Sequence, residues 1–218
     1  MKPIYGFWHN AIVGHWKVVL KRQYKKLCDS GLLDASEKVI LNTVGSTDIS
    51  ILPTEIREDS RITFSFNEDR EVLEYDTLGI LQDEVSDKDC NIWYIHVKGA
   101  ISSGGDPTNN CWHWGEYMEY FTIMNWRKST PILEQNDITG VEWREHPSFH
   151  YSGNFWWATS DYIKRLPLMK DYTNLADRIQ AEFWIGQGRP IRTHCFYNFK
   201  DNLYISHKLR PVNWEIFK

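Results

Sequence analysis

Short runs of apolar and aromatic residues alternate along the chain with segments in which apolar residues recur at helical spacing. The runs predict strands at 3–8, 38–43, 61–66, 91–95 and 138–143. The periodic segments predict helices at 16–27, 70–84, 112–130, 158–166 and 174–185. The expected inward stripes of the third and fifth helices are Tyr117, Tyr120, Phe121 and Met124, and Leu175, Ile179 and Phe183.

Strands that alternate with helices predict an α/β fold with a mixed, mostly parallel central sheet and helices on both faces. The chain contains no internal repeat, low-complexity tract or clear domain boundary, so we expect residues 1–218 to form one domain. Ligands of such sheets bind beyond the carboxyl ends of the strands. The residues that follow each strand are therefore the first candidates for a site.

Residues suited to a phosphorylated ligand follow three of the predicted strands. They are His9, Asn10, Gly45, His96, Lys98 and Gly99. Lys98 can place a point charge against a diphosphate, and Gly99 lets the backbone turn close to it. His96 could ligate a metal or donate a hydrogen bond to phosphate. The alternative is an ordinary strand end with a surface lysine.

Aromatic residues gather at 149–158 around a Ser-Gly-Asn turn. The candidates here are Ser152, Gly153, Asn154 and Trp156. Glycine lets a ligand approach the backbone, and the asparagine carboxamide suits vicinal hydroxyls. Together with tryptophan faces, the turn predicts a sugar site. Trp156 and Trp157 cannot both face the sugar, because strand neighbours point to opposite sides. The alternative is a buried aromatic strand with a bulge at Gly153.

Composition narrows the classes of function. The 218 residues are 42% hydrophobic and 15% aromatic, include 11 Trp, and carry a net charge of -4. The acidic balance disfavours a nucleic-acid partner. Four well-separated cysteines predict neither a disulfide framework nor a zinc ribbon. The sequence has no signal-peptide pattern and no apolar run of membrane-spanning length, so we expect a cytoplasmic protein, bacterial or in the host cytoplasm if viral.

Three segments, 92–99 (IWYIHVKG), 152–158 (SGNFWWA) and 181–184 (AEFW), together resemble a glycosyltransferase of GT-A (Rossmann-like) architecture. The nearest pattern is the group with an "HxK" strand end, as in rhamnan-synthesis-like and other bacterial and viral polysaccharide enzymes. The resemblance implies a nucleotide-sugar donor, most often UDP-linked, and a glycan or glycoprotein acceptor. It also implies a glycine beside the donor sugar, matched by Gly153, and a carboxylate facing the acceptor, matched by Glu182 with Asp177 as second choice.

This sequence departs from the GT-A pattern at the metal site. GT-A enzymes usually hold a divalent metal, Mn²⁺ or Mg²⁺, with Asp-x-Asp at the position occupied here by His96-Val97-Lys98. Either Lys98 neutralises the phosphates instead, or His96 ligates a metal together with His194 or His207. Metal dependence is thus left open.

Glu182 has a chemical case of its own. A sugar hydroxyl is a poor nucleophile, and a carboxylate within hydrogen-bond reach assists it by taking the proton. The alternative is a surface ion pair with Arg178, four residues earlier on the predicted helix. Glu182, with Asp177 as the second choice that the resemblance implies, is the candidate catalytic residue.

With the resemblance, these features favour a glycosyltransferase that uses a nucleotide sugar; the resemblance implies a hexosyl or deoxyhexosyl unit and a role in polysaccharide synthesis. A second hypothesis is a non-catalytic carbohydrate-binding protein with a Trp-rich surface. A third, a module that stacks nucleobases, fits the aromatic content but not the acidic charge.

Overall fold

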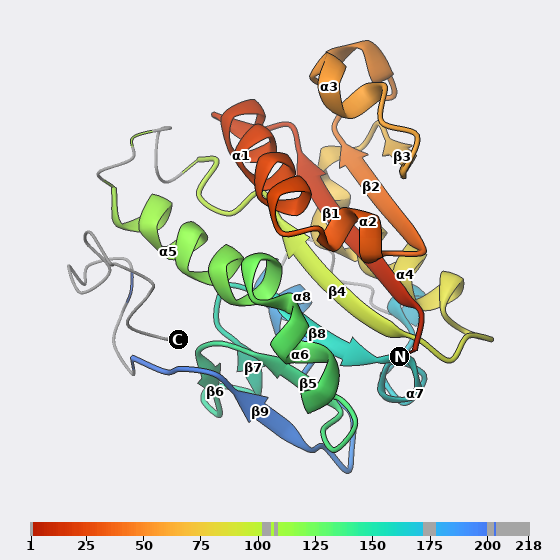
Figure 1. Cartoon of the computed structure of the whole chain (residues 1–218), viewed down its shortest axis with the longest axis vertical. Coiled ribbons are helices and arrows are strands. Elements are labelled where there is room, and N and C mark those ends of the chain that lie inside the picture. The colour runs from red at the N-terminus through yellow and green to blue at the C-terminus, as the bar shows by residue number, and fades with distance from the viewer. Residues whose placement is uncertain (1, 102–105, 107–108, 172–177, 200–202, 204–218) are drawn as a thin grey trace.

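The computed structural model describes residues 2–101, 106, 109–171, 178–199 and 203 (Figure 1). Within these residues the centre is a seven-stranded sheet in the order β3-β2-β1-β4-β8-β5-β9. Its strands are β1 (Ile4–Ala11), β2 (Lys38–Val44), β3 (Ile62–Asn67), β4 (Asn91–His96), β5 (Ile138–Gly140), β8 (Trp156–Thr159) and β9 (Thr193–Cys195). Only β8 runs antiparallel to its neighbours. The expected mixed, mostly parallel α/β sheet is confirmed.

Helices cover both faces of the sheet (Figure 1). The α-helices are α1 (Trp16–Asp29), α2 (Leu32–Ala35), α3 (Thr54–Arg57), α4 (Leu73–Glu84), α5 (Asn110–Glu119), α6 (Trp126–Ile132), α7 (Ser160–Ile163) and α8 (Arg178–Trp184). Shorter 3-10 turns are η1 (Ile49–Ile51), η2 (Arg70–Val72) and η4 (Met169–Asp171), and η3 (Tyr120–Met124) is a π turn. One apolar core lies beneath α1, α5 and α6, and the other beneath α4, α7 and α8.

The predicted strand at 138–143 is interrupted in the structure. It divides into β5 and β6 (Trp143–Arg144), and β6 pairs with β7 (His150–Tyr151) in a separate two-stranded sheet. The break coincides with Glu142, a non-glycine residue with φ of 58°. Such a backbone conformation cannot continue a strand.

Two predicted helical stripes are partly wrong. Tyr117 and Phe121 are buried, but Met124 is 37% exposed, because the π turn after α5 rotates the later residues relative to a regular helix. On α8, Ile179 is 53% exposed, whereas Ala181 and Trp184 are buried. Leu175 lies outside the described residues.

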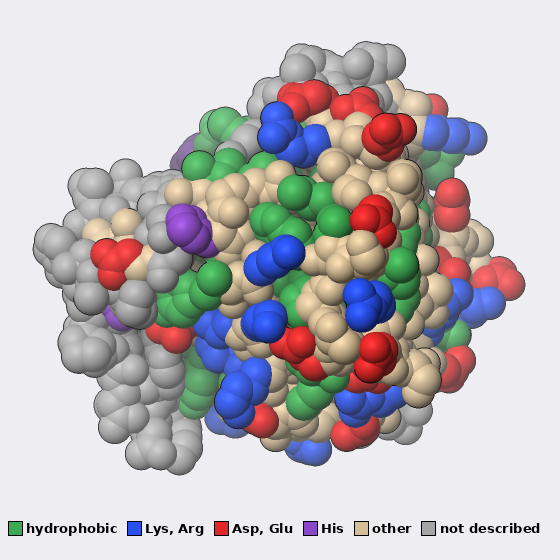
Figure 2. All heavy atoms as spheres, turned by 90° about the horizontal axis from the view of Figure 1, so that it is seen from above, with side chains coloured by type: hydrophobic (Ala, Val, Ile, Leu, Met, Phe, Trp, Pro, Cys, Tyr) green, Lys and Arg blue, Asp and Glu red, His purple; other side chains and the backbone are tan. Residues whose placement is uncertain are grey.

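The surface shows no strong segregation of charge on the face in Figure 2, where basic and acidic side chains are interspersed. Among the described residues, no helix combines the length and the apolar character needed to cross a membrane. All four cysteines are free of disulfides.

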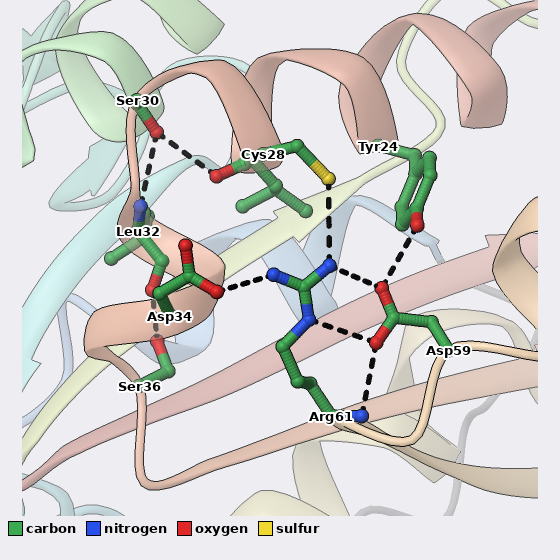
Figure 3. A network of polar contacts seen from close by, with 9 residues as sticks. Tyr24, Cys28, Ser30, Leu32, Asp34, Ser36, Asp59 and Arg61 are labelled. Carbon is green, nitrogen blue, oxygen red and sulfur yellow. Dashed lines mark hydrogen bonds and ion pairs between the residues drawn. The ribbon is translucent and has the colours of Figure 1, made fainter.

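A polar network ties the segment that leads into the edge strand β3 to the helices α1 and α2 (Figure 3). The guanidinium of Arg61 bonds both carboxylate oxygens of Asp59 and also contacts Asp34 at the start of α2. The hydroxyl of Tyr24 on α1 donates to Asp59 at 2.8 Å. These hydrogen bonds, chiefly those from Arg61, lower the pKa of Asp59 to about 2.

Replacing Arg61 by Ala is expected to lower the free energy of unfolding near pH 6 by about 1 kcal/mol. Because the folded-state pKa of Asp59 lies below its ordinary value of 3.8, this stabilisation is present above about pH 4 and is lost as the pH falls towards 2. Urea unfolding at pH 6 and pH 3 measures the difference. Arg57→Ala is the control, since its ion pair with Glu58 is 3.7 Å long and the Glu58 side chain is 68% exposed. An equal loss in both variants contradicts the role of Asp59.

Candidate active site

A cavity of about 350 Å³ opens at the carboxyl ends of β1 and β4, under the first turn of α4. Its polar lining consists of His9, Arg70, Glu74, His96 and Lys98, and apolar residues such as Leu73 and Val97 complete the wall. This is the place where parallel α/β sheets bind ligands. The cavity therefore is the candidate active site.

Two histidines lie side by side on the floor of the cavity. His9 and His96 are register partners on the neighbouring parallel strands β1 and β4, so their side chains project from the same face of the sheet. The Nδ1 atom of His9 lies 2.7 Å from the Thr77 hydroxyl. Burial lowers the pKa of His9 to about 4, so its imidazole is neutral at pH 7.

Glu74 lies in the first turn of α4 and is fixed by two donors. The Tyr94 hydroxyl and the Asn154 amide both donate to its Oε2 atom, at 2.7 and 2.6 Å. Its Oε1 atom lies 3.9 Å from Nδ1 of His96. The preceding residue, Leu73, has φ of 51°, a conformation that costs free energy and that clusters at functional sites.

The two cationic residues come from the loops after β3 and β4. Lys98 is 8% exposed, and its ammonium lies 4.0 Å from the centroid of the Trp114 ring. Gly99 follows with φ of 84° and also lines the cavity. Arg70 is more exposed, with 55% of its side chain accessible. The positive charges thus lie at the mouth and along one wall of the cavity.

The Ser152–Asn154 turn lies behind the cavity wall. His96 Nε2 donates to the carbonyl oxygen of Gly153 at 2.9 Å, because a carbonyl can only accept. The Gly153 amide donates to Glu182 on α8. Asn154, with φ of 57° and 2% exposed, bonds Glu74 and accepts from the Trp156 indole. The turn therefore supports His96 and Glu74 from behind.

The reason for the glycine at position 153 differs from the expected one. A Cβ atom there would lie 2.4 Å from the sulfur of Met118 and 3.2 Å from the Trp114 indole nitrogen. The space beside Gly153 is thus filled by α5 side chains rather than left for a sugar. Its φ of 95° also favours glycine.

Of the predicted site residues, His9, His96, Lys98 and Gly99 line the cavity, and Gly153 and Asn154 contact residues that line it. Glu182 does not line the cavity and is linked to the site through the Gly153 amide. Gly45, with φ of 99°, lies beside Arg70, and Ser152 bonds the Glu142 carbonyl. Asp177 lies outside the described residues.

The structure contradicts two predicted site residues, Asn10 and Trp156. Asn10 alternates with His9 along β1 and so points to the opposite face of the sheet, where its amide donates to Thr43. Trp156 is fully buried and stacks on Tyr94 with ring centroids 5.1 Å apart. Trp157, on the other face, is 1% exposed. Both tryptophans are core residues, one in each apolar core.

The structure does not bring His96 and His194 together as joint metal ligands. They stand on β4 and β9, which are separated by β8 and β5, so strand spacing alone puts them about 14 Å apart. His194 instead contacts the Thr139 hydroxyl at 2.9 Å. His207 lies outside the described residues. Among the described residues, no three His, Cys, Asp or Glu side chains form a group that could hold a metal.

Sequence reasoning missed Glu74, Arg70 and Leu73. The rule that ligands bind at the carboxyl ends of strands applies equally to the residues after β3, and this segment contains all three. The acidic first turn of the predicted helix was the available signal.

The sequence model of a family described as a domain of unknown function (DUF8361) matches residues 11–203. The chain belongs to this family. No curated protein matches the sequence.

Three solved structures are similar to the chain at low identity. HddC from Yersinia pseudotuberculosis is 11% identical, with 91% of each chain covered and a TM-score of 0.48. Rv0371C from Mycobacterium tuberculosis H37Rv, in complex with manganese, is 12% identical over 90% of this chain and 89% of that one, with a TM-score of 0.43. Glucosyl-3-phosphoglycerate synthase from Mycobacterium tuberculosis, in complex with Mn²⁺, UDP and phosphoglyceric acid, is 13% identical over 76% of this chain and 58% of that one, with a TM-score of 0.38. No residue role is transferred from structures this distant.

Proposed function

We propose that the chain is a glycosyltransferase that moves a hexosyl or deoxyhexosyl unit from a nucleoside diphosphate sugar to a glycan or glycoprotein hydroxyl. UDP is the expected nucleotide, as the sequence resemblance implies. The main support is the cavity at the carboxyl ends of β1 and β4, which combines the cations Arg70 and Lys98 with the carboxylate Glu74. Sugar transfer needs cationic groups that stabilise the negative charge of the leaving diphosphate. It also needs a carboxylate that can accept a proton from a sugar hydroxyl.

The proposal assigns the diphosphate to Lys98 and Arg70 rather than to a metal. The described residues offer no three-ligand group for a divalent ion, and the cavity lining contains one carboxylate among them. Manganese is accordingly a variable in the test and not a premise. The neutral His9 adds a hydrogen-bonding group without adding charge.

The rival hypothesis of a non-catalytic carbohydrate-binding protein needs tryptophans at the surface. Most of the described tryptophans are buried instead: Trp8, Trp16, Trp93, Trp114, Trp126, Trp156, Trp157 and Trp184. Trp112 and Trp143 are half-buried, and Trp214 lies outside the described residues. The aromatic content is therefore explained by packing, and the rival loses its main support.

Calorimetric titration with UDP, GDP, CDP and dTDP, each with and without manganese, tests the proposal. Binding of at least one nucleotide, with the same affinity in the absence of manganese, is the expected result. Failure of all four to bind at millimolar concentration contradicts the proposed function. Affinity that appears only with manganese contradicts the assignment of the diphosphate to Lys98 and Arg70.

Lys98→Met is expected to weaken binding of the nucleoside diphosphate by about 10–100-fold, the loss of one charge-assisted contact of about 1.5–3 kcal/mol. Methionine keeps an apolar stem over Trp114, so the thermal midpoint should change little. Lys17→Met is the matched control, because Lys17 also lies over a tryptophan, Trp16, but outside the cavity. Equal affinities in wild type and Lys98→Met contradict the phosphate role.

A further inference from the structure

Glu74 is the only carboxylate among the described residues that line the cavity. It belongs to α4, in the part of the chain that follows β3, whereas the sequence pointed to Glu182 on α8. The two glutamates are linked to the same turn, since Asn154 donates to Glu74 and Gly153 donates to Glu182. Their surroundings therefore allow a direct comparison.

The two oxygens of Glu74 have different environments. Oε2 accepts from the Tyr94 hydroxyl and the Asn154 amide, and both of these donors are at least 98% buried. Oε1 lies 3.9 Å from Nδ1 of His96, a distance too long for a hydrogen bond. One oxygen thus anchors the side chain while the other keeps capacity to accept from a ligand in the cavity.

The Tyr94 hydroxyl stays protonated and so can always donate its hydrogen bond to Oε2 of Glu74. Burial, together with the neighbouring charge of Glu74, raises the pKa of Tyr94 well above its ordinary value, so the hydroxyl keeps its proton. Tyr94 is itself held by stacking on Trp156. The carboxylate is therefore held in one orientation by groups that do not titrate near neutral pH.

Glu182 lacks both features. It does not line the cavity, and its Oε1 atom accepts the hydrogen bond from the Gly153 amide. That bond fixes the turn whose carbonyl oxygen holds His96. Glu182 is accordingly a positioning residue that acts through Gly153.

We infer that Glu74 is the general base that takes the proton of the attacking hydroxyl; this inference rests on the proposed glycosyltransferase function. In the step, the acceptor oxygen forms a bond to the anomeric carbon as its proton passes to Oε1 of Glu74. The bond from the anomeric carbon to the diphosphate breaks, and the nucleoside diphosphate leaves with the electron pair beside Lys98 and Arg70. No oxidant or further reactant is needed.

The test compares Glu74→Gln with Glu182→Gln. The probes are UDP-glucose, UDP-galactose, UDP-N-acetylglucosamine and dTDP-rhamnose, with release of the nucleoside diphosphate to water as the rate and calorimetry as the measure of binding. Glu74→Gln is expected to reduce the turnover rate by about 100–10,000-fold, the usual contribution of a general base, with donor affinity within about threefold. Glu182→Gln is expected to stay within about tenfold of wild type, because the glutamine oxygen still accepts from Gly153.

The outcomes separate the two claims. Wild-type protein that binds none of the four donors contradicts the proposed function itself. If turnover stays at the wild-type rate in Glu74→Gln but is lost in Glu182→Gln, the inference alone is contradicted. Glu182 is then the general base. Thermal midpoints of both variants are measured alongside, and glutamine at position 74 can still accept from Tyr94 and Asn154.

Tyr94→Phe provides a second variant that leaves Glu74 in place. Removing one of the two donors to Oε2 is expected to lower the turnover rate by about tenfold, with donor affinity unchanged, because the base is held less firmly. A merely structural role for Tyr94 predicts a lower thermal midpoint with an unchanged rate, and that result would count against the inference.

Discussion

Gly153→Ala is expected to lower the free energy of unfolding by about 2–5 kcal/mol. Forcing an alanine into positive φ costs about 1–2 kcal/mol, and the Gly153 φ is 95°. A Cβ at 2.4 Å from the Met118 sulfur adds an overpacking cost of about 1–3 kcal/mol, since Met118 is fully buried and can move little. For a chain of this size, thermal unfolding should shift down by roughly 5–15 °C.

Gly31→Ala is the matched control for this prediction. Gly31 has φ of 71°, but a Cβ there would meet only the end of the Arg127 side chain, at 3.4 Å. It therefore carries the backbone cost without the clash, and we expect a loss of about 1–2 kcal/mol. Equal losses at positions 31 and 153, measured by urea unfolding, would show that the contact with Met118 is not the constraint.

The same substitution also tests how the turn supports the cavity. The Gly153 carbonyl accepts from His96 and its amide donates to Glu182, so displacement of the turn moves both partners. We expect Gly153→Ala to weaken nucleotide binding as well as stability. If Gly153→Ala loses stability but binds UDP as the wild type does, the turn does not support ligand binding in the cavity.

The regular part of the fold followed from the sequence because it depends on local pattern. The apolar runs of β1, β2, β3 and β4 located the parallel half of the sheet, and the carboxyl-end rule then brought His9 and His96 into consideration. Their adjacency required only the register of two neighbouring parallel strands.

The wall behind the cavity could not be predicted in the same way. Gly153 is glycine because Met118 on a distant helix fills the space, and no local pattern records that contact. Asn154 looked like a ligand for sugar hydroxyls, yet its amide serves Glu74. Residue types that suit sugars also suit buried polar networks, and only tertiary contacts distinguish the two.

A second buried network joins α1, α5 and the end of β4 on the other face of the sheet. Glu119 has a fully buried side chain and accepts from Arg22 at 2.6 Å and from Lys26 at 2.8 Å. Gln23 donates to Glu119 and also to the carbonyl oxygen of His96, at 3.1 and 2.8 Å. Burial alone would raise the pKa of Glu119, but the two cations outweigh it and the pKa lies below the ordinary value.

Glu119→Gln is expected to lower the free energy of unfolding by about 3–5 kcal/mol, because Arg22 and Lys26, whose side chains are only 11% and 23% exposed, are left without their counter-charge. The folded-state pKa of Glu119 is lower than the ordinary value of 4.5, so the loss is largest above that pH and shrinks as the pH falls below it. Urea unfolding of wild type and variant at pH 7 and pH 4 measures both effects.

Asp29→Asn is the control on the same helix, since its pair with Lys25 is exposed at 48% and 76% and should contribute only about 0.3–0.5 kcal/mol. A loss in Glu119→Gln no larger than this would mean that water reaches Arg22 and Lys26 in solution. Because Gln23 connects Glu119 to the His96 carbonyl, the large loss should be accompanied by weaker nucleotide binding. If Glu119→Gln loses stability but binds the nucleotide as the wild type does, the network only holds α1 against α5 and does not support the site.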